Sequence, residues 1–196
     1  MESTSAIQPR SLAQIHAGLD GVQQSPRVLG TLDLVVRRPA VDAREVLAEA
    51  QLDPAVGLVG DTWGQRPSSR TPDSSPHPDM QLNVINSRFV RLVAGSDDPQ
   101  AWALAGDQLY LDLDLSVDAL PAGSRLAIGD EAVIEVTDQP HTGCAKFAAR
   151  FGRDAHKLVW SEEGTRLRLR GLNARVVVAG TIRPQDPVRV VGTDPS

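Results

Sequence analysis

The chain has 196 residues, of which 41% are hydrophobic and 23% are charged, as is ordinary for one soluble globular domain. Its single cysteine excludes an intrachain disulfide framework, a CxxC redox pair and a zinc site built from cysteines alone. The four histidines lack the HxxxH spacing of a zinc protease. A net charge of -5 and an aromatic content of 4% argue against a nucleic-acid partner, which needs a basic footprint and rings that stack on bases.

The first residues show no basic segment followed by an apolar one, the pattern of a secretory signal. No apolar run approaches the roughly 18 residues that a membrane-spanning helix needs. The sequence therefore predicts a cytoplasmic protein without a membrane partner, in which a lone cysteine stays reduced.

Four segments of the N-terminal half carry local signals. Residues 6–19 predict a short helix, and residues 28–37 alternate apolar and polar side chains, which predicts a strand. Residues 42–50 predict a helix, because Asp42 could cap it with a glutamate three positions on as a capping box. Residues 65–78 are almost wholly proline, serine and polar or charged residues, which indicates an exposed loop.

The C-terminal half predicts mainly short strands, after a helix over residues 87–93. Residues 108–115 alternate strictly, with leucines on one face and Tyr110, Asp112 and Asp114 on the other, which predicts a strand with one solvated side. Strands that recur every 8–12 residues or so favour a small barrel or a sandwich. The further predicted strands span residues 125–128, 132–137, 167–169, 173–178 and 188–191.

The most informative segment surrounds the cysteine. Residues 145–151 predict a helix that ends at Gly152, so Cys144 lies at or next to the N-terminus of that helix. Unpaired N–H groups at such a position favour a thiolate, the form that attacks sulfur or binds soft metals. A lone cysteine is also often a small buried hydrophobic residue, and the residues leave both interpretations open.

Basic residues gather around this thiol. Between Thr142 and Arg175, eight basic residues face only three acidic ones. One interpretation is a pocket for an anion, because guanidinium forks match phosphate oxygens. The other is a solvated strand face, on which Arg166, Arg168 and Arg170 would alternate with leucines. The eight are Lys146, Arg150, Arg153, Lys157, Arg166, Arg168, Arg170 and Arg175.

An ordered set of motifs resembles the MOSC domain, named for the C-terminal domain of molybdenum-cofactor sulfurases. The motifs are GLVGD at residues 57–61, GDQLY from 106, LPAGSRLAIG from 120, PHTGCAKF from 140, and RGLNARV from 170. Gln108 departs from the asparagine that the family often has. Gln185 replaces a glycine before the aspartate near the end. The loop over residues 65–78 lies where many members of the family carry basic or histidine-containing segments, and the sequence assigns it no role.

The resemblance implies a β-rich, mixed α+β fold: a small β-barrel with short flanking helices over residues 28–191. Residues 1–27 would then be an N-terminal extension and residues 192–196 a tail. It also implies that Cys144 either ligates molybdenum in a pterin cofactor or carries sulfane sulfur. The residues it assigns to the cofactor phosphate are Lys146, Arg150, Arg170 and Arg175. Those it assigns to the pocket lining are His141, Thr142 and Asp61.

Three functions remain open at this point. The first is a molybdenum-cofactor enzyme, an oxidoreductase that acts on a small-molecule substrate. Because the chain has no GxGxxG motif for a nicotinamide cofactor and no iron–sulfur cysteine spacing, its electrons would come from a separate donor protein. The second is a sulfur carrier that receives a persulfide on Cys144 from a cysteine desulfurase. The third is a non-catalytic binding module, in which the cysteine only packs. No motif identifies the substrate.

Overall fold

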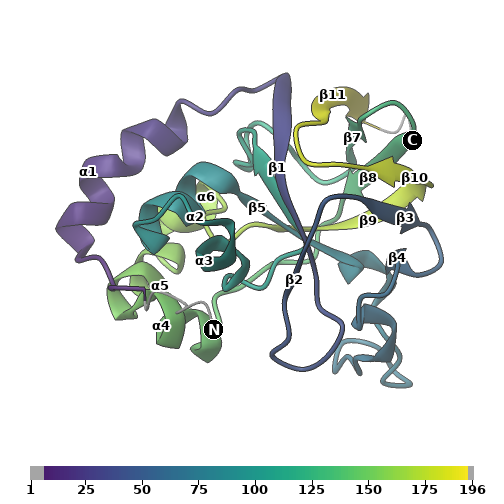
Figure 1. Cartoon of the computed structure of the whole chain (residues 1–196), viewed down its shortest axis with the longest axis horizontal. Helices are drawn as coiled ribbons and strands as arrows, with labels where there is room; N and C mark the ends of the chain where they lie inside the picture. The colour runs from purple at the N-terminus through teal and green to yellow at the C-terminus, as the bar shows by residue number, and fades with distance from the viewer. Residues whose placement is uncertain (1–6, 194–196) are drawn as a thin grey trace.

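The barrel is the centre of the computed structural model, which describes residues 7–193 (Figure 1). Among these residues, seven strands close into a ring in which neighbours run antiparallel, except that β5 and β6 are parallel. β1 closes the ring because it pairs with β11 at one edge and with β6 at the other. In ring order the strands are β1 (Leu29–Arg37), β11 (Pro187–Thr193), β7 (Ser124–Ile128), β8 (Ala132–Val136), β9 (Leu172–Val178), β5 (Leu82–Asn86) and β6 (Leu109–Asp112).

Helices gather on one side of the barrel, and a small sheet lies on the other side (Figure 1). None of the helices in the described part of the chain is both long and apolar enough to cross a membrane. The helices are α1 (Leu12–Gln23), α2 (Ser87–Ala94), α3 (Pro99–Ala103), α4 (Ala145–Phe151), α5 (Arg153–Val159) and α6 (Glu162–Arg166), with short 3-10 turns at Trp63–Gln65 and Pro78–Met80. The small sheet comprises β10 (Gly180–Ile182), β3 (Ala50–Asp53) and β4 (Gly57–Leu58), and β2 (Glu45–Leu47) pairs with the end of β1.

The hydrophobic side chains form one core inside the barrel and another between the barrel and the helices. On β1, Leu32 and Val35 belong to the barrel interior, whereas Leu34 and Val36 pack under the helices. A register shift against β6 between Leu32 and Leu34 accompanies this exchange of faces. Each such side chain contributes about 1.5–3 kcal/mol to the stability of the fold when it is fully buried. Because β1 contributes side chains to both cores, it links them.

The predicted β-rich fold with a small barrel and short flanking helices is confirmed. Most of the predicted strands and helices agree with the observed elements to within two residues at each end. They are the strands over residues 28–37, 125–128, 132–137, 173–178 and 188–191, and the helices over 87–93 and 145–151. The helix predicted over 6–19 begins later, at Leu12, because the side chains of Ser11 and Gln14 form a reciprocal capping box there. Residue 6 lies outside the described residues.

The helix predicted over residues 42–50 is wrong. Asp42 has a φ of +60°, which a helix N-cap does not adopt, and the segment forms a loop followed by β2. Glu45 faces Arg37 across the strand pair, with its carboxylate 2.6 Å from the guanidinium. Tertiary pairing with β1 therefore outweighs the local capping pattern.

The strand predicted over residues 167–169 is also wrong. Residues 167–170 form a turn after α6, in which Arg168 has a φ of +47°. The guanidinium of Arg168 donates to the carbonyl oxygens of Leu115 and Leu120, and these bonds hold the turn against the barrel. The alternating arginines consequently do not share one face of a strand.

The solvated side predicted for residues 108–115 is wrong at Tyr110. The strand β6 is present, but Tyr110 is fully buried in the core beneath the helices. Its hydroxyl donates to the carbonyl of Trp102 on α3, and burial raises the pKa of the phenol. The short helix α3 therefore covers a face that alternation alone predicted to be open.

Candidate anion-binding site

A cavity of about 410 Å³ opens at the end of the barrel where β1 finishes and β6 begins. It is lined by residues from six separate parts of the chain: the segment after β1, the 3-10 turn region near residue 66, strand β5, the segment before β6, the start of helix α4 and the turn before β9. We call it the cationic pocket, because six of its lining residues are basic. They are Arg38, Arg44, Arg66, Lys146, Arg150 and Arg170; Asp42 and Cys144 also line it.

Arg38 forms one wall of the cationic pocket and is held rigidly. Its guanidinium makes two bonds to the carboxylate of Asp61, at 2.9 and 2.8 Å, and a third at 2.8 Å to the side-chain oxygen of Asn83. The backbone N–H of Arg38 donates to the same carboxylate, and both side chains are buried. A bidentate pair of this kind fixes the guanidinium plane but leaves no net charge.

A second buried pair supports the opposite wall. Arg170 donates to both carboxylate oxygens of Asp107, at 2.9 and 2.8 Å, and lies over the ring of Phe147. His141 Nε2 lies 2.8 Å from the same carboxylate. Burial, the largest single influence, would raise the pKa of Asp107, but the guanidinium of Arg170 and the interactions with His141 together outweigh it, so this pKa lies below its usual value. Burial, together with the charge of Arg170, lowers the pKa of His141, so the imidazole is neutral at pH 7.

Arg44 and Arg66 have no carboxylate partner among the described residues, and Arg170 keeps one nitrogen atom unpaired. The Nε atom of Arg44 is buried and has no hydrogen-bond partner in the described part of the chain, and the same is true of Arg170 Nε. Burial, followed by the charge of Arg150, lowers the pKa of Arg44; burial and the charge of Arg38 lower that of Arg66. A buried donor without a partner costs about 1–3 kcal/mol, so these groups are poised for an acceptor that the protein itself does not supply.

Helix α4 brings two more cations and the thiol. Lys146 and Arg150 both contact Asp42, at 2.6 and 3.3 Å, and Arg150 also donates to the carbonyl of Leu104. The carboxylate of Asp42 is exposed, and its hydrogen bond with Lys146 lowers its pKa. Cys144 precedes α4 in an extended conformation, is exposed, and its side chain makes no capping hydrogen bond.

The segment that carries Cys144 is held close against α5. A Cβ atom built on Gly143 would lie 3.0 Å from Trp160 Nε1 and from a methyl group of Val159. A side chain there would push the neighbouring residues aside, so glycine sets the close approach that positions the thiol. The sequence predicted the helix start at Cys144 but not this contact.

The structure places the predicted site residues in three groups. Cys144, Lys146, Arg150 and Arg170 line the cationic pocket itself. Asp61 and His141 support it, the first through Arg38 and the second through Asp107, while Thr142 lines a neighbouring cavity. Arg175 lies apart from the pocket and pairs with Glu135 and Asp79.

Sequence reasoning missed four residues of the site: Arg38, Arg44, Arg66 and Asp107. They lie far from the cysteine along the chain, whereas the group of basic residues that is evident around the cysteine in the sequence begins only at residue 142. Asp107 follows the glycine of the GDQLY motif, which is the one local signal that could have pointed to it.

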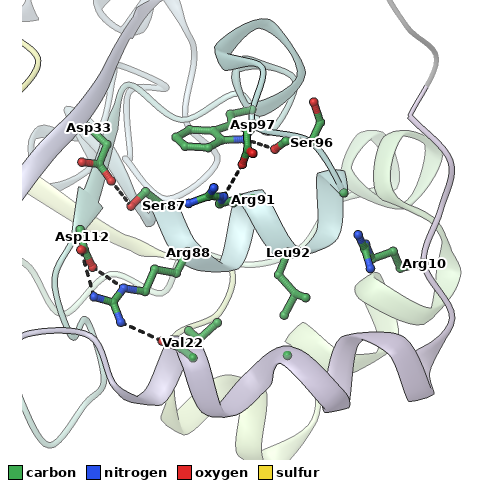
Figure 2. A pocket seen from close by; sticks show the side chains of 14 residues that line it. Arg10, Val22, Asp33, Ser87, Arg88, Arg91, Leu92, Ser96, Asp97 and Asp112 are labelled. Atoms are coloured by element: carbon green, nitrogen blue, oxygen red, sulfur yellow. Dashed lines mark hydrogen bonds and ion pairs between the residues drawn. The ribbon is translucent and has the colours of Figure 1, made fainter.

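A larger cavity of about 760 Å³ lies between α1 and α2, and it too is lined by charged side chains (Figure 2). Figure 2 shows that four of its charged side chains are paired with one another, Arg88 with Asp112 and Arg91 with Asp97, whereas Arg10 is drawn without a partner. Ser87 donates to Asp33, whose pKa is raised by burial and by Asp112. None of the described residues of this crevice has a fully buried side-chain donor without a partner, so we assign no ligand to it.

The closed barrel with short flanking helices places the chain among small mixed β-barrel proteins, and a cationic pocket lies beside its single thiol. The family model of the MOSC domain matches residues 77–189, more than half of the chain, and the chain belongs to the MOSC domain family. No curated protein matches it.

Two solved structures share the fold. The YuaD protein from Bacillus subtilis superimposes with a TM-score of 0.57 at 16% sequence identity, over 82% of this chain and 94% of that one. YiiM from Escherichia coli gives a TM-score of 0.52 at 20% identity, over 82% of this chain and 69% of that one. At these identities the likeness concerns the fold alone.

Proposed function

We propose that the cationic pocket binds the molybdenum cofactor, an anionic pterin that carries a phosphate and the metal, and that Cys144 ligates the molybdenum. The MOSC family is associated with this cofactor. The observation that carries the proposal is the pair of buried, unpartnered Nε atoms of Arg44 and Arg170 in a pocket whose rim holds the thiol.

The charges of the pocket fit such a ligand. Its six cations are opposed by three carboxylates, those of Asp42, Asp61 and Asp107, which leaves an excess of about three positive charges. A phosphate monoester carries a charge of about -1.5 to -2 at pH 7, and its oxygens accept hydrogen bonds from guanidinium groups. Arg44, Arg66 and Arg170 would hold the phosphate, and the cations of α4 would screen the remaining negative charge.

A thiolate is a soft ligand, which suits the metal centre of this cofactor better than the harder oxygen ligands nearby. When bound, molybdenum supplies two-electron oxygen-transfer chemistry to a small substrate, with electrons from a separate protein donor. The protein's own part is to bind and orient: the Arg38–Asp61 and Arg170–Asp107 pairs fix the two walls, and helix α4 presents Cys144 between them.

A second candidate is a sulfur carrier, which the exposure of Cys144 favours. The Cys144 thiolate would attack the terminal sulfur of a donor persulfide on a cysteine desulfurase. A new S–S bond forms on Cys144, the donor S–S bond breaks, and the donor leaves as a thiolate that takes up a proton. The product is a Cys144 persulfide, heavier than the free thiol by about 32 Da, one sulfur atom.

The test is to purify the wild type and Cys144→Ser from a host that makes the cofactor, and to measure molybdenum, pterin and protein mass. The proposal predicts molybdenum and pterin in the wild type and loss of the metal from Cys144→Ser. A reducible mass increase on Cys144 without metal would favour the sulfur carrier. If Cys144→Ala left the metal and pterin content unchanged, and the wild type carried no reducible mass increase, the chain would be a non-catalytic binding module.

A further inference from the structure

A second cavity, of about 370 Å³, lies on the other side of the segment that carries Cys144. We call it the tryptophan pocket. It is lined by Val117, His141, Val159, Trp160, Arg168 and Leu172, among others, and it shares Arg170 with the cationic pocket. The function proposed for the cationic pocket does not involve this cavity.

One wall of the tryptophan pocket is apolar. Trp160 ends helix α5 and is 54% exposed, although it is one of the largest hydrophobic side chains of the protein. Val117 is 44% exposed on the opposite segment, whereas Val159 and Leu172 form buried parts of the lining. An exposed ring facing a hollow is a surface on which a flat or aliphatic group can pack.

One cation of this pocket has no acidic partner. Arg168 uses Nη1 to bond the carbonyls of Leu115 and Leu120, while its Nε and Nη2 atoms donate to nothing within residues 7–193. Neither atom is among the fully buried nitrogens that lack a partner, so both keep some solvent exposure. Burial lowers the pKa of Arg168, and no carboxylate lies close enough to oppose that shift.

Two of the other polar groups of the pocket are already bound to a carboxylate, and the third, Asp138, keeps its negative charge at the exposed rim. Arg170 is neutralised by Asp107, and His141 is bound to the same carboxylate through Nε2. Asp138 is exposed at the rim and accepts a hydrogen bond from Gln139. The pocket therefore offers one uncommitted positive charge beside an apolar wall, in contrast to the several unneutralised cations of the cationic pocket.

We propose that the tryptophan pocket binds a small organic acid, whose carboxylate pairs with Arg168 and whose apolar part packs against Trp160. A single carboxylate matches the single free guanidinium edge, and two parallel N–H donors suit its two oxygens. The left-handed backbone of Arg168 is rare for a residue other than glycine, and this residue lines the pocket. The inference is independent of whether the cationic pocket holds a cofactor.

The test is a titration of the full chain with benzoate, and with benzamide as the uncharged probe of the same shape, by calorimetry and by nuclear magnetic resonance. The proposal predicts that benzoate binds about tenfold more tightly than benzamide, because only benzoate can form the charged hydrogen bonds. Arg168→Gln should abolish this preference. Arg166→Gln is the matched control, since Arg166 is exposed two residues away and pairs with Asp118; it should keep the preference.

Two further measurements locate the site. Trp160→Ala should weaken both probes severalfold, and the ring protons of benzoate should show Overhauser contacts with the Trp160 indole in the wild type. If Arg168→Gln fails to fold, these two measurements decide. Equal affinity for the two probes, no saturable benzoate binding below about 10 mM, or loss of benzoate binding in Arg44→Gln would overturn the proposal.

Discussion

The crevice between α1 and α2 and the cationic pocket are both rich in arginine, yet their arginines are used differently. In the crevice, Arg88 and Arg91 each bond a carboxylate nearby, and Arg88 also donates to the carbonyl of Gly21. In the cationic pocket, Arg44 and Arg170 keep buried nitrogen atoms without partners. The smaller cavity is therefore the better candidate site, because unsatisfied donors indicate a missing ligand and cavity size does not.

The largest expected effect concerns the buried pair of Asp107 and Arg170. Asp107→Asn removes the charge that compensates a buried guanidinium, so we expect a loss of about 3–5 kcal/mol in the free energy of unfolding, measured with urea. Asp112→Asn is the matched change in the crevice, where the pair with Arg88 is partly exposed, and it should cost less than about 1 kcal/mol. Equal losses for the two variants would remove the distinction between the regions.

The next effect is on anion binding. Pyrophosphate should stabilise the wild type against heat, because an anion that binds only the folded state raises its stability. Arg44→Gln should weaken the apparent affinity about tenfold, the effect of losing one charged hydrogen bond. The crevice variant Arg91→Gln should leave it unchanged. An affinity that falls equally in both variants would indicate general attraction by surface charge.

A smaller effect concerns pH. The pKa of His141 in the folded protein lies below its unfolded value of about 6.5, so below that pH the unfolded state binds more protons. Stability should therefore be intact above about pH 6.5 and fall as the pH drops, by at most about 1.4 kcal/mol per unit. His141→Gln should flatten this slope between pH 7 and 5.5, and an unchanged slope would show that other groups cause it.

The smallest effect concerns the position of the thiol. Gly143→Ala should change the rate at which a neutral alkylating reagent modifies Cys144 severalfold, because the added methyl group would press on Trp160 and Val159. Gly18→Ala is its counterpart in the crevice, where the methyl group would meet only the flexible end of Leu92. It should leave the alkylation rate unchanged, which a side-by-side kinetic assay would show.

The barrel strands could be predicted because every second side chain of a strand is buried. This leaves an alternation of apolar and polar residues that is visible in the sequence. The Asp42–Glu45 segment could not, since its helix-capping pattern is local while its pairing with β1 is tertiary. The same limit applies to the site. Cys144, Lys146 and Arg150 lie together on one short segment, so the sequence showed them as a group. Arg38, Arg44 and Arg66 reach the pocket only because β1 and the segments after it fold back toward α4.

The central claim is that the cationic pocket holds the molybdenum cofactor with Cys144 on the metal. X-ray absorption at the molybdenum edge, recorded on protein purified with its cofactor, tests it most directly. The account predicts a sulfur contribution from the protein that disappears in Cys144→Ser and persists in Arg91→Gln. A spectrum that is the same in the wild type and Cys144→Ser, or protein that takes up no molybdenum from a competent host, would contradict it.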